Sequence, residues 1–147
     1  MKIHEIVRDA ADTIREIGIL SRVAVIEEDK GNVATELESA VGRTNFAVVV
    51  GWDGFTPRIV GETAPHETPF GSVTIVATIF EKPVVNRANP SAPRILQAAQ
   101  EIAKALDGAA SEAMDDVMHL RRISPVSEVE RSGVVMCTVE FETKATL

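Results

Sequence analysis

The stretch from Gly71 to Gly108 limits the possible folds of this 147-residue chain more than any other part of it. It begins with a β-branched strand, Val73–Glu81, that carries apolar residues on both faces. A connection interrupted by prolines follows, and then an amphipathic helix. The apolar face of that helix consists of Ile95, Ala99, Ile102 and Leu106. Pro93 is expected in the first turn of the helix and Gly108 just past its end. The stretch therefore predicts a central strand and the helix that covers it.

Hydrophobic periodicity predicts the other elements. The residues that form a helical stripe near the N-terminus are Ile3, Val7, Ala10, Ile14 and Ile17, with Gly18 as the stop. The expected strands are Leu20–Ile26, Phe46–Val50, His119–Val129 and Val134–Lys144. We expect a turn at Gly51–Phe55, a loop or extended arm at Pro57–Pro69, and a second helical piece at Ala109–Val117. Asn32–Val41 fits both a helix and a strand, and its Leu, Glu and Ala residues favour the helix.

These elements predict one α+β domain over residues 1–147, a mainly antiparallel sheet of about four to five strands with helices packed on one face. In the last strand, Val135, Cys137 and Val139 alternate with polar residues, as in a sheet with one covered and one wet face. Hydrophobic residues make up 45% of the chain, which is ordinary for a globular domain and argues against disorder.

Charge and composition argue against several classes of partner. The net charge is -7 and aromatic residues are only 4%, so neither a basic footprint nor a stacking platform for nucleic acid is expected. No run approaches the roughly 18 apolar residues that a membrane span needs, and the N-terminus lacks the apolar core of a signal peptide. A single cysteine, Cys137, cannot form an internal disulfide. We therefore expect a soluble protein made and used in the cytoplasm.

The residues that could carry chemistry are few. Asp115 and His119 would share a helix face near Glu112, but a metal site needs three or four converging ligands, so a solvated helix end is favoured. Glu62, His66 and Glu67 lie in the proline-rich segment, which offers a general base no fixed partner. Cys137 falls on the inward phase of its strand, where a cysteine acts as a small hydrophobe. No phosphate-loop or nucleophile motif occurs. We expect no catalytic residue, no cofactor and no metal.

Trp52 and Phe55 allow two interpretations. They could close one end of the core, or they could anchor a protein contact, because exposed aromatic side chains are typical of interfaces. The proline-rich segment beside them has the composition of an arm that orders against a neighbouring subunit. The candidate interface residues are Trp52, Phe55, Pro57, Arg58, His66 and Pro69.

The order of the elements resembles that of the tail terminator and tail-completion proteins of long-tailed bacteriophages, including the lambda-like minor tail proteins. An N-terminal amphipathic helix is followed by the strand FAVVVGWDGF, a long loop, the strand VTIVATIFEKP and the helix RILQAAQEIAKALDG. The strands MHLRRISPVSEV and VVMCTVEFETKA close the chain, the second with a V-x-x-x-V-x-F pattern. The resemblance covers nearly the whole chain. The family has no invariant catalytic or binding signature, so no residue role carries over.

The resemblance implies a structural protein of the virion tail, assembled in the cytoplasm of the bacterial host. Subunits would form a ring, hexameric in the family, that caps the tail tube, ends its polymerisation and meets the head connector proteins. The acidic charge would line a conduit through which DNA passes without specific binding, and no membrane partner is implied. Two alternatives stay open: a neck or head-completion adaptor of similar fold, and a small cytoplasmic enzyme or ligand-binding domain with its pocket near His66 or His119.

Overall fold

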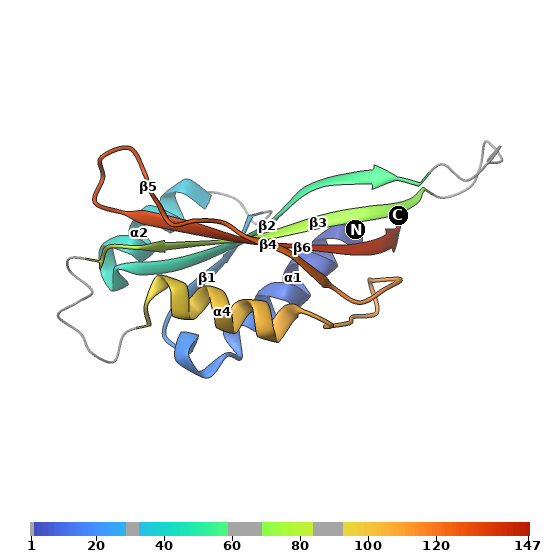
Figure 1. The fold of residues 1–147 in the computed structure, drawn as a ribbon, viewed down its shortest axis with the longest axis horizontal. Coiled ribbons are helices and arrows are strands. Elements are labelled where there is room, and N and C mark those ends of the chain that lie inside the picture. Colours follow the sequence, from blue (N-terminus) through green and yellow to red (C-terminus); the bar gives the residue numbers. More distant parts are fainter. Residues whose placement is uncertain (1, 29–32, 59–68, 84–92) are drawn as a thin grey trace.

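The computed structural model describes residues 2–28, 33–58, 69–83 and 93–147 (Figure 1). Within these ranges the elements are α1 (Lys2–Arg15), the 3-10 turn η1 (Gly18–Leu20), β1 (Ala24–Glu27), α2 (Val33–Thr44), β2 (Phe46–Pro57), β3 (Phe70–Glu81), α4 (Ile95–Leu106), β4 (His119–Ile123), β5 (Ser127–Glu128) and β6 (Val135–Thr146). The described strands form one six-stranded sheet in the order β1-β2-β3-β6-β4, and the two-residue β5 pairs with β6 beside this path. The expected α+β fold with a mainly antiparallel sheet is confirmed.

The middle of the sheet consists of β2, β3 and β6, which are twelve residues long and pair antiparallel. Along β3 every second residue from Gly71 to Glu81 is buried, which is the period that a pleated strand imposes. This strand has β2 on one side and β6 on the other. The prediction that Val73–Glu81 is the central strand is therefore confirmed.

At one edge of the sheet, β1 pairs parallel with β2, with Ala24 opposite Ala47. The pair can be parallel because helix α2 returns the chain from the end of β1 to the start of β2. The expected strand Leu20–Ile26 was too long. Leu20 belongs to η1 instead, and its buried side chain joins the core beneath the sheet.

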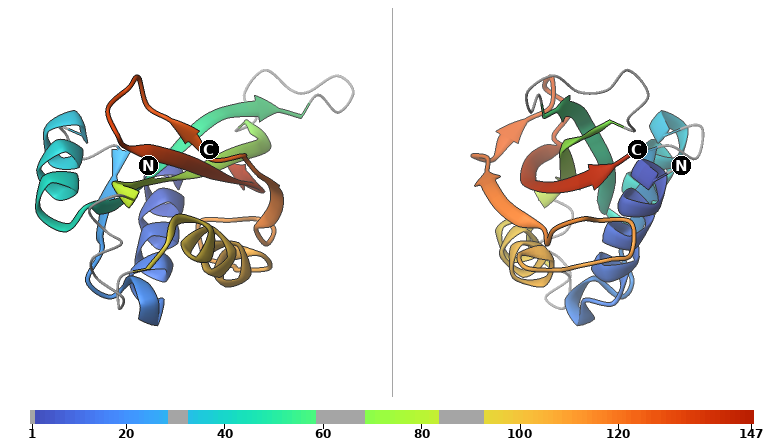
Figure 2. Two further views of the ribbon diagram at one scale, coloured as in Figure 1. Left: turned by 60° about the vertical axis from the view of Figure 1, so that its left-hand side comes forward. Right: turned by 90° about the vertical axis from the view of Figure 1, so that its right-hand side faces the viewer.

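The main core lies between the sheet and helices α1 and α4, which pack side by side on one face (Figure 2). The largest of its fully buried side chains among the described residues are Ile6, Ile14, Leu20, Phe46, Ile75, Ile79, Ile102, Leu106, Met118 and Phe141. The predicted stripes of both helices face this core, because their apolar residues recur at the helical period.

Helix α2 packs on the opposite face, where Ala40 and Val41 contact Ile26 and Ala47. The helical interpretation of Asn32–Val41 is confirmed from Val33 onward, while Asn32 itself lies outside the described residues. Helices were expected on one face of the sheet, and α2 additionally covers the other face near β1 and β2.

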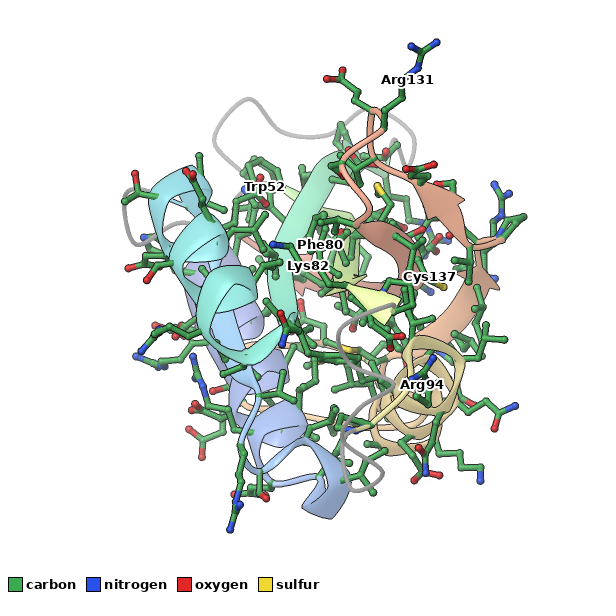
Figure 3. The ribbon with its side chains drawn as sticks, turned by 90° about the vertical axis from the view of Figure 1, so that its left-hand side faces the viewer. Trp52, Phe80, Lys82, Arg94, Arg131 and Cys137 are labelled. Carbon is green, nitrogen blue, oxygen red and sulfur yellow. The ribbon has the colours of Figure 1, made fainter. Side chains whose placement is uncertain are left out.

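A buried carboxylate fixes the start of α4. Glu81, at the end of β3, is 1% exposed, and its Oε2 accepts a hydrogen bond of 2.8 Å from the N–H of Ile95. Arg94, which lies at the start of α4 (Figure 3), places its guanidinium 3.5 Å from Glu81 Oε1. A carboxylate at this position satisfies an otherwise unpaired N–H and complements the helix dipole. Pro93 precedes Arg94, the N-cap residue, so the expectation that it lies in the first turn was wrong.

Two expectations for the C-terminal part were also wrong. Residues 109–117 form turns and no helix, since the backbone pairs Gly108 N with Met118 O and Met118 N with Ala109 O. The predicted strand His119–Val129 is divided into β4 and β5 around Ser124–Val126, because Pro125 has no N–H for a strand ladder.

Candidate interaction surfaces

The distal half of the β2–β3 hairpin holds most of the predicted interface residues. Gly51–Phe55 was expected to be a turn, but β2 continues through it to Pro57. The register shifts between Trp52 and Phe55, as in a β-bulge, and Gly54 there has a φ of 110°, which glycine adopts without strain. The bulge lets a hydrophobic strand accommodate the polar pair Asp53–Gly54 without ending.

The two aromatic residues divide the two roles that the sequence left open. Phe55 is half-buried and packs against the main core. Trp52 is 43% exposed. A solvent-exposed indole is typical of the residues that anchor protein interfaces, so Trp52 is the stronger interface candidate of the two.

The far end of the same hairpin carries the remaining candidates. Pro57, Arg58 and Pro69 are exposed there, and the N–H of Arg58 donates to Phe70 O at 2.8 Å. The N–H of Leu147 donates to Pro69 O at 2.8 Å, so the C-terminus lies at this end of the molecule (Figure 1). The exposed Leu147 was missed by the sequence analysis. His66 lies outside the described residues.

Gly71 sets the close pairing of these strand ends. A Cβ at this position would overlap the carbonyl oxygen of Thr56 and come within 2.7 Å of Pro57 Cα. Only glycine therefore lets β3 approach β2 so closely at the end of the hairpin.

An open hollow of about 320 Å³ lies on the sheet face opposite α1 and α4. Its floor contains Val49, Val76, Thr78 and Thr138, each of which alternates with a core-facing neighbour on its strand. Its border contains Trp52 and three carboxylates, Glu28, Asp53 and Glu140. No lysine or arginine among the described residues lines it, so its surface is acidic with an apolar and hydroxyl floor.

The space above Gly51 brings one of these carboxylates over the sheet. A Cβ on Gly51 would overlap the Glu28 carboxylate, which lies directly above the glycine. Neither Glu28 nor Asp53 has an ion-pair partner within the described ranges. Both are exposed, so both carboxylates are available to a cation from outside the chain.

Strand β4 forms the other edge of the sheet, and all five of its residues are exposed. Its N-terminal end is fixed to α4, because Asp107 Oδ1 accepts a hydrogen bond of 3.0 Å from the N–H of Leu120. β4 is thus an edge strand with exposed side chains along its whole length. Exposed apolar side chains on or just after this edge are Leu120, Ile123 and Val126.

His119 is held in a polar cluster and does not meet Asp115. Its Nε2 lies 3.3 Å from Asp116 Oδ2, whereas Asp115 Oδ2 accepts a hydrogen bond of 2.6 Å from Thr146. The N–H of Val117, and then His119, lower the pKa of Asp116 below its ordinary value. No group of three or more potential metal ligands occurs among the described residues. The Asp115–His119 pairing that a helix would create is therefore absent, because residues 109–117 are not helical.

Cys137 is buried, as the inward phase of its strand predicted. Its Sγ lies 3.2 Å from Ser124 O, and desolvation raises the pKa of the thiol. Figure 3 shows the side chain within the body of the molecule. The residue fills core space, as a buried free cysteine usually does.

Comparison with known proteins gives an informative structural likeness. No family model and no curated protein matches the chain. A chain from the virion of a native gene transfer agent particle has a similar structure, with a TM-score of 0.55 and 12% sequence identity over 94% of this chain and 92% of that chain. A crystal structure from Akkermansia muciniphila aligns with a TM-score of 0.32 and 9% identity over 99% of this chain and 77% of that chain, too low for any comparison of folds. The first likeness shows a shared fold over nearly the full length of both chains.

Among the described helices, none has the length and apolarity required to cross a bilayer.

Proposed function

We propose that this chain is a structural protein of a phage-like virion, a tail terminator whose subunits form a ring on the end of the tail tube. The observation that carries the proposal is the shared fold with a chain of a gene transfer agent virion, which extends over nearly all of both chains. The element order of the sequence, which resembles the tail terminator family, supports the same class independently of that comparison.

The distribution of exposed side chains fits a subunit with contacts at several sides. The hairpin end with Pro57, Arg58 and Leu147 lies at one end of the molecule, and the β5–β6 hairpin with Arg131 lies toward the other (Figures 1 and 3). Trp52 and the β4 edge provide further exposed apolar area between the two ends. In the proposed assembly, the two ends would meet the tail tube and the head connector proteins, and the sides would meet neighbouring subunits.

Native mass and negative-stain imaging at high protein concentration test the ring. A hexamer would have a mass of about 95 kDa, since one chain has a mass of 15.8 kDa. The function itself is tested by a tube-capping assay, in which purified tail tube protein polymerises with and without this chain. We expect shorter tubes with a ring at one end, while tubes of unchanged length would count against the terminator.

The arm prediction has its own test, which concerns residues outside the described ranges. Deleting residues 62–68 should weaken self-association while leaving the thermal transition nearly unchanged, because an arm contributes little to its own subunit's core. The control is Glu5→Ala, an exposed residue of α1 that is not an interface candidate. An association constant that the deletion does not alter would argue that this segment is not an arm.

Three further measurements test the alternatives and the expected lack of DNA binding. A neck or head-completion adaptor should bind the connector proteins and leave tube length unchanged. A small enzyme or ligand-binding domain with its pocket near His66 or His119 should lose ligand or activity when both are replaced by Ala, whereas a ring protein should assemble as before. An electrophoretic mobility assay with duplex DNA should show no retained complex, because the net charge of -7 repels the DNA phosphates.

A further inference from the structure

The two edges of the sheet differ in how open they are. At the β1 edge, Arg15 donates to the carbonyl oxygen of Val25 at 2.9 Å and to the Glu27 side chain (Oε2) at 3.0 Å, so it occupies one backbone acceptor of that strand. At the β4 edge, Ser124 N donates inward to Thr138 O, and the alternation of an antiparallel ladder turns the N–H of Ile123 outward. Because Asp107 Oδ1 already binds the N–H of Leu120, the part of the β4 edge that is open to another chain is the end at Ile123.

Helix α4 extends this edge with apolar surface. Asp107 contacts Leu120 of β4, which identifies the side of α4 that faces the edge. Leu96 lies eleven positions before Asp107, close to three full helical turns, so it is on that same side of the helix. Leu96 is 58% exposed, the largest value among the large hydrophobic residues that the structure describes. Figure 2 shows α4 running beneath β4. We call Leu96, Leu120, Ile123, Val126 and Arg122 the edge surface.

The charge of the edge surface favours a partner that is not another β4. Arg121 already pairs with Glu142 at 3.1 Å, whereas Arg122 has no ion-pair partner within the described ranges. Two copies of β4 paired antiparallel would bring these arginines together, and like charges across a ladder are destabilising. The edge surface is thus suited to an acidic surface with apolar area.

The acidic hollow on the open sheet face has this composition. Its border holds Glu28 and Asp53 together with Trp52, and its floor is partly aliphatic. Glu28 directly follows β1 and Asp53 lies on β2, so the two carboxylates are four and three strands away from β4 in the sheet order. At a strand spacing of about 4.8 Å this separation is roughly 14–19 Å. Salt screens interactions beyond about 8 Å, so Arg122 does not neutralise Glu28 and Asp53 within one subunit. Glu140, the third carboxylate of the hollow, lies opposite Arg122 on β6, but the two form no ion pair.

We propose that the edge surface of one subunit binds the acidic hollow of a second copy of this chain. The contact joins two different surfaces, so every subunit uses both, and such a contact gives a ring when the rotation between neighbouring subunits closes. Arg122 approaches Glu28 and Asp53 of the neighbour, while the apolar side chains of the edge cover Trp52 and the hollow floor. The proposal rests on the ring of the proposed function and names the surfaces that build it.

Charge reversal on each surface tests the contact. The edge variant is Arg122→Glu, and the hollow variant combines Glu28→Lys with Asp53→Lys. Each variant alone should self-associate at least about tenfold more weakly than the wild type, since like charges then face each other across the contact. Sedimentation velocity measures association, and the emission of Trp52, the single tryptophan, should shift to shorter wavelength as the hollow is covered.

Mixing the two variants in equal amounts makes the test specific. Each hollow–edge contact in an alternating ring then joins either two wild-type surfaces or two reversed ones, so association should return to within about threefold of wild type. The control for the edge is Lys104→Glu on the solvent side of α4, and the control for the hollow is Glu5→Lys with Glu112→Lys. These charge reversals should leave association unchanged.

The outcomes separate this inference from the proposed function. Rings that form equally well from both variants overturn the edge–hollow contact and leave the ring intact. A hollow variant that assembles like the wild type while the edge variant does not indicates edge-to-edge pairing and overturns the proposal. Restored assembly on mixing, in a chain that leaves tail tube length unchanged, supports the contact and overturns the terminator. A wild-type chain that stays monomeric at the highest concentration overturns both.

Discussion

Replacing Glu81 with Ala should be the most informative single perturbation of this fold. The carboxylate is 1% exposed and accepts the first N–H of α4 at 2.8 Å, so truncation leaves that buried N–H without its acceptor. A hydrogen bond to a charged group contributes about 1.5–3 kcal/mol, and the cavity left by the side chain adds about 1 kcal/mol. The ion pair with Arg94 adds little, because the arginine side chain is 41% exposed and water screens it.

The expected loss for Glu81→Ala is therefore about 2.5–4 kcal/mol, a fall in Tm of roughly 5–15 °C for a chain of this size. Glu81→Gln keeps the shape and an amide oxygen that can still accept from Ile95, and it relieves the burial of a charge. We expect it to lose about 1 kcal/mol at most, the part due to the helix dipole and the weaker acceptor.

Urea unfolding followed by circular dichroism measures these changes, with Glu101→Ala as the matched control. Glu101 is on the same helix, and its pair with Lys104 at 3.6 Å is exposed, so its loss should be no more than about 0.5 kcal/mol. If Glu81→Ala and Glu101→Ala have equal effects, the argument that Glu81 fixes the start of α4 is refuted.

Three other predictions concern particular residues. Gly71→Ala should lose about 1–3 kcal/mol because its methyl group meets the backbone of β2, whereas Gly42→Ala, with open space in helix α2, should gain about 0.5–1 kcal/mol in the same urea assay. Burial raises the pKa of the Cys137 thiol, so its contribution to stability is present below the usual thiol pKa and is lost as pH rises through the raised value. Labelling by a disulfide reagent at about pH 8 should therefore proceed at the rate of unfolding, and rapid labelling of the native chain would contradict this. The Val117 N–H, and then His119, lower the pKa of Asp116, so the contribution of Asp116 to stability is present above the ordinary aspartate pKa and lost as pH falls through the lowered one. In His119→Ala, the titration midpoint of Asp116 measured by NMR should rise only part of the way to the ordinary value, and an unchanged midpoint would exclude His119 as a cause.

Local patterns in the sequence accounted for the elements whose side chains alternate or recur regularly. The stripes of α1 and α4, the central strand β3 and the inward phase of Cys137 follow directly from period-3.6 and period-2 burial. Glycine and proline were less decisive. Gly51–Phe55 has the composition of a turn but lies within β2. The segment stays in the strand because it pairs with β3 and because a bulge between Trp52 and Phe55 accommodates Gly54.

The candidate interface was only partly within reach of the sequence. Composition singled out Trp52, and the structure leaves it exposed. Leu147 and Leu96 gave no signal, because a terminal leucine or one leucine off a helical stripe is common in any soluble chain. The acidic hollow could not be anticipated either, since Glu28, Asp53 and Glu140 come from three strands or their ends and meet only through the register of the sheet.

The sequence by itself determined the class of fold and its layers, because burying apolar side chains at two fixed periods leaves few arrangements of strands and helices. It also determined the acidic balance and the absence of familiar nucleotide or nucleophile motifs. Only the tertiary structure decided which edge of the sheet is covered and which is open. Arg15 reaches the backbone of β1 from ten residues away, whereas at β4 the Asp107 side chain binds the N–H of Leu120 near the start of the strand. Such long-range contacts depend on how elements pack, which no local pattern encodes.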